Sequence, residues 1–237
     1  MIETNKILNM DCLEGMRAME SESIDLCITS PPYNLGNNHH TNKKRHNPYS
    51  DNMPEEEYQA WQIQVLNEIY RVLKNGGWLF YNHKNRIKRG RMITPYEWLL
   101  KTKFTIRQEI NWNNGTYNFD EIRFYPRCER IYCLAKGKAW MYNRLKLTDD
   151  WHIEPVETDV EHTRAFPDKL VKNIMATVNF ETVLDPFMGS GTVGRIADEH
   201  GKKWIGFELK KEYAESGERK LSEQRAMLSL FLKNHPR

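Results

Sequence analysis

A glycine turn that follows a short apolar run is the feature of this sequence that most restricts its fold. Val183 and Leu184 lead through Asp185 into Gly189 and Gly191, and a helical pattern begins directly afterwards. Glycines allow a tight turn and the close approach of a ligand to the backbone. The first N–H groups of the helix have no partner within it and can bind a polar group. The candidate cofactor-binding residues of this predicted strand–turn–helix unit are Asp185, Phe187, Gly189, Ser190, Gly191 and Thr192.

The rest of the chain alternates short apolar runs with helical periods, a pattern typical of α/β domains. Strands are predicted at residues 24–29, 77–81, 105–112, 130–134, 182–184 and 204–207. Helices are predicted at residues 55–73, 167–178, 192–200 and 210–232. A length of 237 residues suits one sizeable domain over residues 1–237. Residues 113–161 are irregular, aromatic and interrupted by Pro126 and Pro155, so we interpret them as an insertion within that domain.

Two of the predicted helices carry residues that indicate how they end and pack. The helix over residues 55–73 has apolar residues at spacings of three or four, namely Tyr58, Trp61, Val65, Ile69 and Val72. Asn75, Gly76 and Gly77 predict its end and lead into a strand. The helix over residues 210–232 is expected to pack on the sheet through Tyr213, Leu221, Met227, Leu228 and Phe231.

A carboxylate follows the next predicted strand, about twenty residues beyond the glycine turn. Glu208 ends the run at residues 204–207, and an acidic residue at this place commonly binds ribose hydroxyls. Two alternatives stay open. Gly194 completes a G-x-G-x-x-G spacing, so a nicotinamide dinucleotide also fits the turn, although no hydride-transfer chemistry is visible elsewhere. A strand–turn–helix unit that binds nothing would show the same residues.

A rigid loop follows the predicted strand at residues 24–29. Pro31 and Pro32 remove two N–H donors and fix φ, so the carbonyl groups of the loop have fixed directions. Ser30 supplies a hydroxyl acceptor and Tyr33 a flat ring, so the loop can grip a planar amine or amide. We predict catalytic roles for these four residues. An ordinary Pro-Pro turn is the structural alternative, and a covalent nucleophile is disfavoured because Ser30 lacks flanking glycines.

Basic residues gather in two clusters, although the net charge is only +3. Such clusters are often merely solvated, but they can also contact the phosphates of a nucleic acid. The candidates for phosphate contact are Lys43, Lys44 and Arg45 in the first cluster and Arg86, Lys88, Arg89 and Arg91 in the second.

Cysteine spacing and hydropathy bear on metal sites and location. The four cysteines form no C-x-x-C pair, so we predict reduced, packed thiols and no metal site. No run approaches the roughly 18–20 apolar residues of a membrane helix, and the first residues lack a secretory apolar core. We therefore expect a cytoplasmic protein without membrane partners.

These motifs together resemble the β-class DNA amino methyltransferases of bacteria and phages. Residues 30–33 match the family's [DNS]-P-P-[YF] element, and residues 185–191 match its D-P-F-x-G-S-G element. The tetrapeptide precedes the cofactor motif, which is the β-class order. Residues 9–14 resemble a G-D-C-L-E segment, with Met10 at the glycine position, and residues 162–167 resemble H-P-x-x-F-P, with Thr163 at the first proline position.

The resemblance implies a fold, a cofactor and partners. The fold would be a Rossmann-like, mostly parallel seven-stranded sheet with helices on both faces, circularly permuted and carrying a target-recognition insertion. The cofactor would be S-adenosyl-L-methionine, with Asp11 and Cys12 near the adenine, Glu208 on the ribose, and Phe166 and Pro167 at the methionine end. Double-stranded DNA would be the substrate, and a homodimer and a cognate restriction enzyme are further partners that the resemblance suggests.

The resemblance also assigns a reaction to the rigid loop. A flipped-out base would stack on Tyr33, while Ser30 Oγ and the Pro31 carbonyl accept the two hydrogens of its amino group. The residues expected to read base edges are Asn113, Asn114 and Arg123. Serine after Ile28-Thr29 is typical of cytosine-N4 enzymes, and adenine-N6 is the alternative. An RNA base or a protein glutamine as substrate, and a non-catalytic DNA-binding protein, are the other hypotheses.

Overall fold

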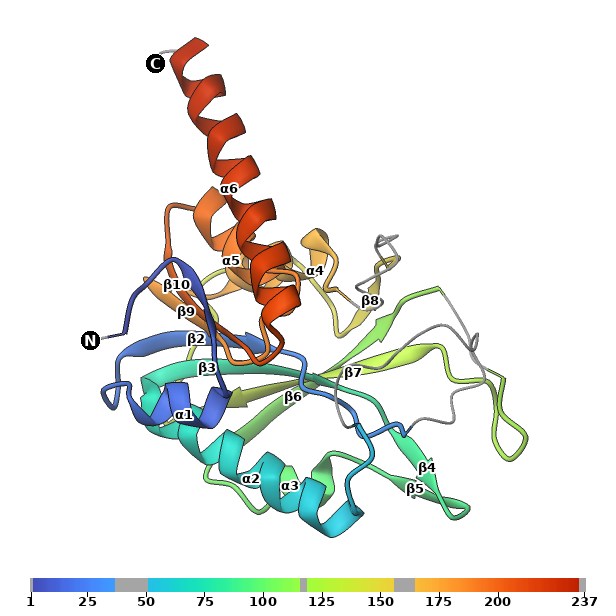
Figure 1. Cartoon of the computed structure of the whole chain (residues 1–237). Helices are drawn as coiled ribbons and strands as arrows, with labels where there is room; N and C mark the ends of the chain where they lie inside the picture. The colour runs from blue at the N-terminus through green and yellow to red at the C-terminus, as the bar shows by residue number, and fades with distance from the viewer. Residues whose placement is uncertain (1, 37–50, 116–118, 156–164, 235–237) are drawn as a thin grey trace.

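The predicted α/β architecture is present in the computed structural model, which describes residues 2–36, 51–115, 119–155 and 165–234 (Figure 1). The strands are β1 (Lys6–Asn9), β2 (Ile24–Thr29), β3 (Leu73–His83), β4 (Arg86–Lys88), β5 (Arg91–Ile93), β6 (Thr105–Asn113), β7 (Cys128–Ala135), β8 (Asp150–His152), β9 (Thr182–Asp185) and β10 (Lys203–Glu208). The helices are α1 (Cys12–Arg17), α2 (Glu55–Val72), α3 (Tyr96–Leu99), α4 (Asp168–Thr177), α5 (Thr192–Glu199) and α6 (Lys211–Asn234).

Within the described residues, eight strands form the main sheet in the order β1-β10-β9-β2-β3-β7-β6-β8. The first five strands of this order run parallel, and β7 runs antiparallel to both β3 and β6. The six strands predicted by residue range are all present in this sheet, together with β1 and the short β8, which pairs with the end of β6; the resemblance implied seven strands in all. The sheet is Rossmann-like and mostly parallel, as predicted.

The permuted order of the chain brings two distant motifs together. Strand β9 lies directly beside β2, with Leu26 opposite Val183 and Cys27 opposite Leu184. Because parallel neighbours end at the same edge of a sheet, the loops after β2 and β9 emerge side by side. The fold thus places the predicted catalytic loop next to the predicted cofactor turn.

Helices cover both faces of the sheet (Figure 1). Leu26 and Ile28 of β2 join one core and Cys27 between them joins the other, because successive side chains of a strand face opposite sides. Ile24 lies before a register shift and joins the core of Cys27. Helices α4, α5 and α6 close the first core, and α1, α2 and α3 close the second. Burial on both faces explains why β2 has apolar residues at consecutive positions from Leu26 to Ile28.

The helix predicted over residues 55–73 ends close to the predicted position, but the glycines that were expected to end it do not do so. Helix α2 ends at Val72, and β3 begins at once with Leu73 in an extended conformation. Gly76, with a φ of +89°, lies inside β3 at an irregularity where the register against β2 shifts. The glycines therefore shape a bulge in the strand and do not terminate the helix.

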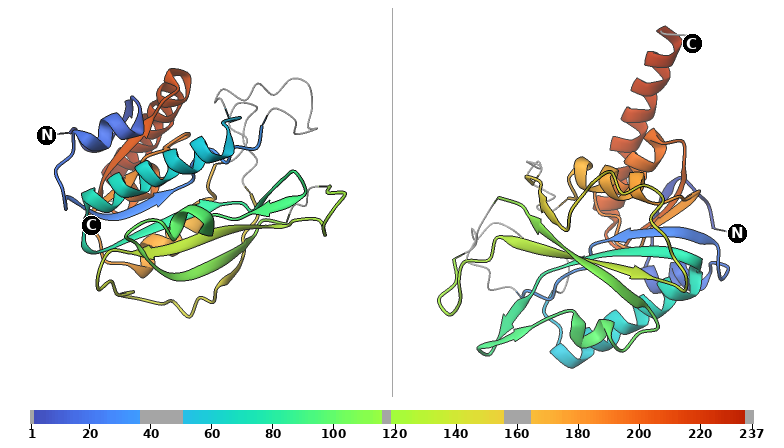
Figure 2. Two further views of the ribbon diagram at one scale, coloured as in Figure 1. Left: turned by 90° about the horizontal axis from the view of Figure 1, so that it is seen from below. Right: turned by 180° about the vertical axis from the view of Figure 1, so that it is seen from behind.

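The final helix packs on the sheet only through its first half. Ala214 and Leu221 are buried, whereas Met227 is 69% exposed and Leu230 is 61% exposed. The remainder of α6 extends away from the sheet, as Figure 1 and the right-hand view of Figure 2 show. The prediction that Met227 packs on the sheet is therefore wrong, and the side chains of Leu228 and Phe231 lie outside the described residues.

Strand β7 divides the segment interpreted as an insertion. Residues 128–135 pair with β3 on one side and with β6 on the other, so they belong to the sheet itself. Of the rest of that segment, the described residues 114–115, 119–127 and 136–149 contain no helix or strand, and residues 136–149 lead into β8. None of the described helices is both long enough and apolar enough to cross a membrane.

Candidate active site

The carboxyl ends of β1, β10, β9 and β2 meet at one edge of the sheet and carry most of the predicted site. Asp11 follows β1, Glu208 ends β10, Asp185 ends β9 and Ser30 follows β2. Since β7 runs antiparallel, it is the beginning of that strand, with Glu129, that lies at this edge. The site is thus assembled from segments that are far apart in the sequence.

A buried hydrogen bond joins the catalytic loop to the cofactor turn. Thr29 Oγ1 donates to Asp185 Oδ1 at 2.8 Å, and the Phe187 N–H donates to the same oxygen at 3.0 Å. Burial raises the pKa of the Asp185 carboxyl to about 7, and the charge of Glu208 adds to the rise, against the lowering effect of the two hydrogen bonds. Asp185 thus stabilises the start of the glycine turn by accepting the Phe187 N–H.

The glycine turn has the backbone that its sequence requires. Gly189 and Gly191 have φ values of +51° and +84°, and Gly191 is the N-cap of α5. The nearest atom to a Cβ built on Gly189 would be 3.9 Å away, so the turn is open to a ligand. At Gly194 a Cβ would lie 3.0 Å from the Trp204 ring. Close packing of helix on strand therefore accounts for the third glycine of the dinucleotide-like spacing.

Glu208 is held beside this turn. It is 3% exposed, and its two carboxylate oxygens accept hydrogen bonds from the Gly189 N–H at 3.0 Å and the Lys210 N–H at 2.8 Å. These two backbone donors hold the carboxylate at the rim of the turn, where an acidic residue commonly binds ribose hydroxyls.

Two further predicted cofactor contacts flank the turn. Asp11 caps α1 by accepting from the Leu13 and Glu14 N–H groups at 2.9 and 3.2 Å. Burial raises the pKa of the neighbouring Cys12 thiol to about 12, so this cysteine contributes packing and no charge. Both residues stand at the end of β1, beside Glu208.

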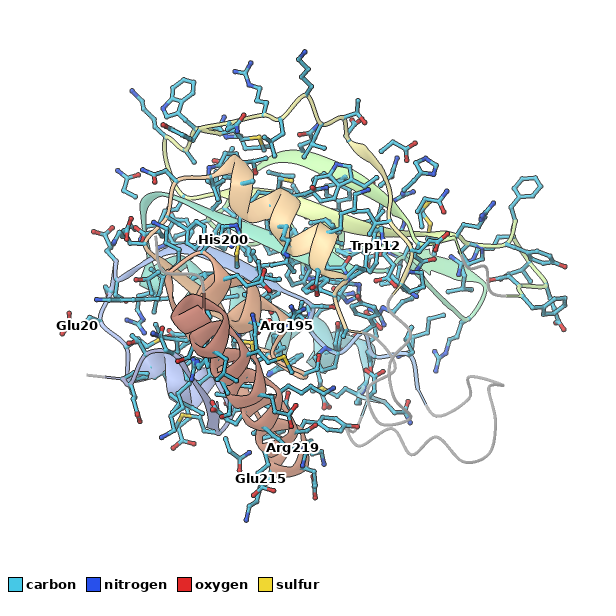
Figure 3. All side chains as sticks on the ribbon, turned by 90° about the horizontal axis from the view of Figure 1, so that it is seen from above. Glu20, Trp112, Arg195, His200, Glu215 and Arg219 are labelled. Atoms are coloured by element: carbon cyan, nitrogen blue, oxygen red, sulfur yellow. The ribbon has the colours of Figure 1, made fainter. Side chains whose placement is uncertain are left out.

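The segment before α4 is anchored from two sides. Phe166 is buried against Trp112 of β6, with ring centroids 6.4 Å apart, and Pro167 is the N-cap of α4. Arg195 of α5 pairs with Asp168; both Arg195 and Trp112 are labelled in Figure 3. The preceding predicted residues 162–164 lie outside the described residues.

The loop at residues 30–33 is fixed by contacts that the sequence did not reveal. Tyr58 of α2 donates to the Pro32 carbonyl oxygen at 2.7 Å. Tyr33 is only 6% exposed, and its ring centroid lies 4.7 Å from that of His83. The Tyr33 ring is therefore largely buried beside His83, while Ser30 stays partly exposed.

Polar side chains from β3 and β7 surround the hydroxyl groups of this loop. Tyr33 Oη lies 2.8 Å from Ser30 Oγ, donates to Glu129 Oε2 at 2.8 Å, and accepts from Asn82 Nδ2 at 2.6 Å. Lys84 Nζ pairs with Glu129 Oε1 at 2.9 Å. Asn82 and Glu129 were not predicted as site residues. The one signal that the sequence offers for them is that each is a polar residue next to an apolar run, at the end of a strand that lies at the edge of the site.

The structure argues against the DNA contact predicted for Arg86. This residue is 5% exposed and forms a two-pronged ion pair with Glu55, at 2.8 and 2.9 Å. Its guanidinium carbon lies 4.8 Å from the centroid of the Tyr58 ring. Partial burial alone would raise the pKa of Glu55, but the hydrogen bonds and charge of Arg86 outweigh it and lower that pKa. Arg86 is thus a structural residue.

Of the other residues predicted to contact DNA, those that the structure describes lie on the β4–β5 hairpin, at the end of β6 or in the residues that follow it. Lys88, Arg89 and Arg91 lie on the β4–β5 hairpin, where Lys88 and Arg91 also face Glu55 and Glu97 at 3.6 and 3.2 Å. Asn113 is the last residue of β6, the buried Asn114 follows it, and Arg123 pairs with Asp120 at 2.7 Å. Lys43, Lys44 and Arg45 lie outside the described residues.

Known proteins are similar to this chain in sequence or in fold. The type II methyltransferase M.ScaI of Streptomyces caespitosus is 25% identical, over 89% of this chain and 80% of its own. The PvuII DNA methyltransferase, described as cytosine-N4-specific, has a TM-score of 0.73 at 21% identity and 92% coverage of both chains. A DNA modification methylase of Thermus thermophilus, complexed with S-adenosyl-L-methionine, has a TM-score of 0.64 at 22% identity, covering 90% of this chain and 93% of its own.

A family model described as DNA methylase, for enzymes of the N6 and N4 type, matches residues 24–219. The match includes the catalytic loop, the β3 and β7 residues around it, the cofactor turn and Glu208. The chain therefore belongs to the N6/N4 DNA methylase family.

Proposed function

We propose that this protein transfers a methyl group from S-adenosyl-L-methionine to the exocyclic amino group of a base in double-stranded DNA, with cytosine N4 as the preferred target. The observation that carries the proposal is the hydrogen bond between Thr29 and Asp185, which holds an acceptor loop next to a cofactor turn. Membership of the DNA methylase family supports the class of reaction.

The residues at the sheet edge fit the proposed cofactor. The open backbone at Gly189 admits a ligand, and the fixed Glu208 carboxylate can accept from both ribose hydroxyls. Asp11 and Phe166 flank this position and would contact the adenine and methionine ends. When bound, the cofactor supplies an electrophilic methyl group on a sulfonium.

The acceptor loop then determines which nitrogen reacts. The amino nitrogen of a base is a poor nucleophile because its lone pair is delocalised into the ring. Acceptors on its hydrogens, Ser30 Oγ and the Pro31 carbonyl, favour a pyramidal nitrogen whose lone pair can attack. Serine is too weak a base to deprotonate the amine beforehand, so positioning and electrostatics supply the rate. As the nitrogen–methyl bond forms, the methyl–sulfur bond would break to leave a neutral thioether, and the cationic nitrogen would then release one proton to solvent.

The choice of cytosine rests on the sequence around Ser30, and adenine N6 is the alternative within the same family. A base inside a duplex cannot reach this loop, so it must be flipped out at a cost of a few kcal/mol. The exposed arginines of the β4–β5 hairpin, Arg89 and Arg91, are placed to contact phosphates. Asn113, Asn114 and Arg123 remain the proposed base-reading residues, and a homodimer and a restriction partner remain predictions.

The test is to incubate the protein with methyl-labelled S-adenosyl-L-methionine and unmethylated genomic DNA, and then to identify labelled nucleosides by mass spectrometry. We expect N4-methylcytosine. Labelled N6-methyladenine would reverse the choice of base and leave the reaction class intact. Label in RNA or protein with none in DNA would contradict the proposed function.

A further inference from the structure

The hydroxyl group of Tyr33 stands at the centre of a buried hydrogen-bond cluster beneath the catalytic loop. Its oxygen lies 2.8 Å from Ser30 Oγ, 2.8 Å from Glu129 Oε2 and 2.6 Å from Asn82 Nδ2. A phenol has a single hydrogen, and a carboxylate oxygen or an amide nitrogen can play only one part in a hydrogen bond. The direction of every bond in the cluster is therefore determined by counting hydrogens.

The count begins at the carboxylate. Glu129 Oε2 only accepts, so Tyr33 directs its single hydrogen to Glu129. Tyr33 Oη can then only accept from its other two neighbours. Asn82 Nδ2 donates one hydrogen to it, and the contact with Ser30 must be a donation from Ser30 Oγ. The hydrogens run in one direction, from Ser30 through Tyr33 to Glu129.

This direction matters for catalysis because Ser30 must accept, not donate, when it meets the target amine. With its hydrogen committed to Tyr33, Ser30 Oγ presents its lone pairs to the substrate. Building on the proposed function, we propose that Glu129 is a positioning residue for methyl transfer, which acts through Tyr33 to turn the Ser30 hydroxyl into an acceptor. Glu129 itself touches neither the base nor the cofactor in this role.

Asn82 reinforces the same direction. Its Nδ2 donates to Glu129 Oε2 at 2.9 Å and to Tyr33 at 2.6 Å, and lies farther, at 3.4 Å, from Ser30 Oγ. Among the described residues its Oδ1 has no hydrogen-bond partner, although Asn82 is buried. Exchanging the two amide atoms would place this oxygen against the carboxylate, so the amide is held in the donating orientation.

Lys84 fixes the remaining side of the carboxylate and supplies a sharp test. Its Nζ pairs with Glu129 Oε1 at 2.9 Å. In a Glu129→Gln variant the amide oxygen would face this ammonium group, and the amide nitrogen would then face Tyr33. Tyr33 Oη and Asn82 Nδ2, which both donate to Oε2, would then lose that acceptor. The substitution therefore releases the Tyr33 hydrogen from its fixed direction, so that Ser30 is no longer held as the donor to Tyr33, at nearly constant shape.

Glu109 offers a matched control. It accepts from the Tyr96 hydroxyl at 2.9 Å and pairs with Arg130 at 2.9 Å, so it repeats the tyrosine–carboxylate–cation arrangement away from Ser30. The full-length parent, Glu129→Gln and Glu109→Gln should be compared for kcat, for KM of S-adenosyl-L-methionine and for thermal stability. We expect Glu129→Gln to lower kcat on the order of tenfold with an unchanged KM, and Glu109→Gln to leave kcat unchanged.

Tyr33→Phe separates an effect transmitted through the hydroxyl from a general structural effect. It keeps the ring against His83 and removes the connection between Glu129 and Ser30. We expect the Tyr33→Phe single variant to lose kcat on the order of tenfold. Adding Glu129→Gln to Tyr33→Phe should cause no further loss of kcat. If Glu129→Gln does not fold, Tyr33→Phe alone decides.

The inference would be overturned if Glu129→Gln or Tyr33→Phe kept the parental kcat. It would also be overturned if Glu129→Gln had an undiminished effect in the Tyr33→Phe background, or if Glu109→Gln lost as much kcat as Glu129→Gln. Each of these results would leave the proposed function standing. A parent protein that methylates no DNA would overturn the proposed function and the inference with it. The two failures are therefore distinguishable.

Discussion

Thr29 Oγ1 donates a buried hydrogen bond to Asp185 Oδ1 at 2.8 Å, across 156 positions of sequence. The bond connects the end of β2 with the end of β9, and so connects the residue before Ser30 with the first residue of the cofactor turn. Both groups are buried, so water does not replace either partner if the other is removed.

Replacing Thr29 with valine should therefore destabilise the protein. Valine keeps the branched shape but lacks the donor, and Asp185 Oδ1 retains only the Phe187 N–H. Leaving a buried acceptor under-satisfied costs about 1–3 kcal/mol. Urea denaturation measures this loss. Thr105→Val, at an exposed position of β6, is the control and should change the free energy of unfolding by less than about 0.5 kcal/mol. Equal effects of the two substitutions would contradict a structural role for the Thr29 hydroxyl.

The raised pKa of Asp185 predicts a pH dependence of stability. Burial lifts this pKa from 3.8 to about 7, so the folded protein holds a proton that the unfolded chain releases between those values. The contribution of Asp185 to stability therefore falls as pH rises from about 4 to 7, and is constant above that window.

An Asp185→Asn variant removes this titration. His83 acts in the opposite sense, because burial lowers its pKa to about 3, so only the difference between variant and parent isolates Asp185. We expect the free energy of unfolding of the variant, relative to the parent, to increase by a few kcal/mol between pH 4 and 7. Parallel curves for the two proteins over this range would be incompatible with a raised pKa at Asp185.

The buried ion pair of Arg86 and Glu55 predicts a strong and specific loss of stability. Arg86→Met leaves Glu55 without its two-pronged partner, which typically costs about 3–5 kcal/mol for a buried pair and less here because Glu55 is partly exposed. Lys88→Met removes an exposed cation 3.6 Å from the same carboxylate and should cost under about 1 kcal/mol. Chemical denaturation compares the two, and a similar small loss for both would mean that Arg86 is not structural.

The parts of the fold that follow local patterns could be predicted from the sequence. Residues 24–29 were predicted with the bounds that β2 has, because five of its six side chains are buried and most of them are apolar. The glycine turn and Glu208 were found because their backbone demands and spacing are local. Strand β1 was missed because only Ile7 is buried among its four residues, which leaves no periodic signal.

Contacts between distant segments could not be predicted in this way. Glu129 meets Tyr33 across 96 positions, and the contact exists only because β7 enters the sheet next to β3. Arg86 looked like part of a solvated basic cluster because its partner Glu55 lies on another element, α2. In both cases the charge of a residue was visible in the sequence, but its burial and its partner depended on the tertiary structure.

The roles of Ser30 in methyl transfer and of Glu208 in cofactor binding are tested most directly by measuring binding and transfer separately. Binding of S-adenosyl-L-methionine by calorimetry and transfer of labelled methyl groups to DNA should be measured for the parent, Ser30→Ala, Glu208→Gln and the exposed control Ser222→Ala. We predict that Ser30→Ala binds the cofactor like the parent and loses about 10²–10³-fold in kcat, because it removes an acceptor used in the transition state. Glu208→Gln should lose cofactor affinity, and Ser222→Ala should match the parent. Parental turnover by Ser30→Ala would contradict the assignment of the catalytic loop.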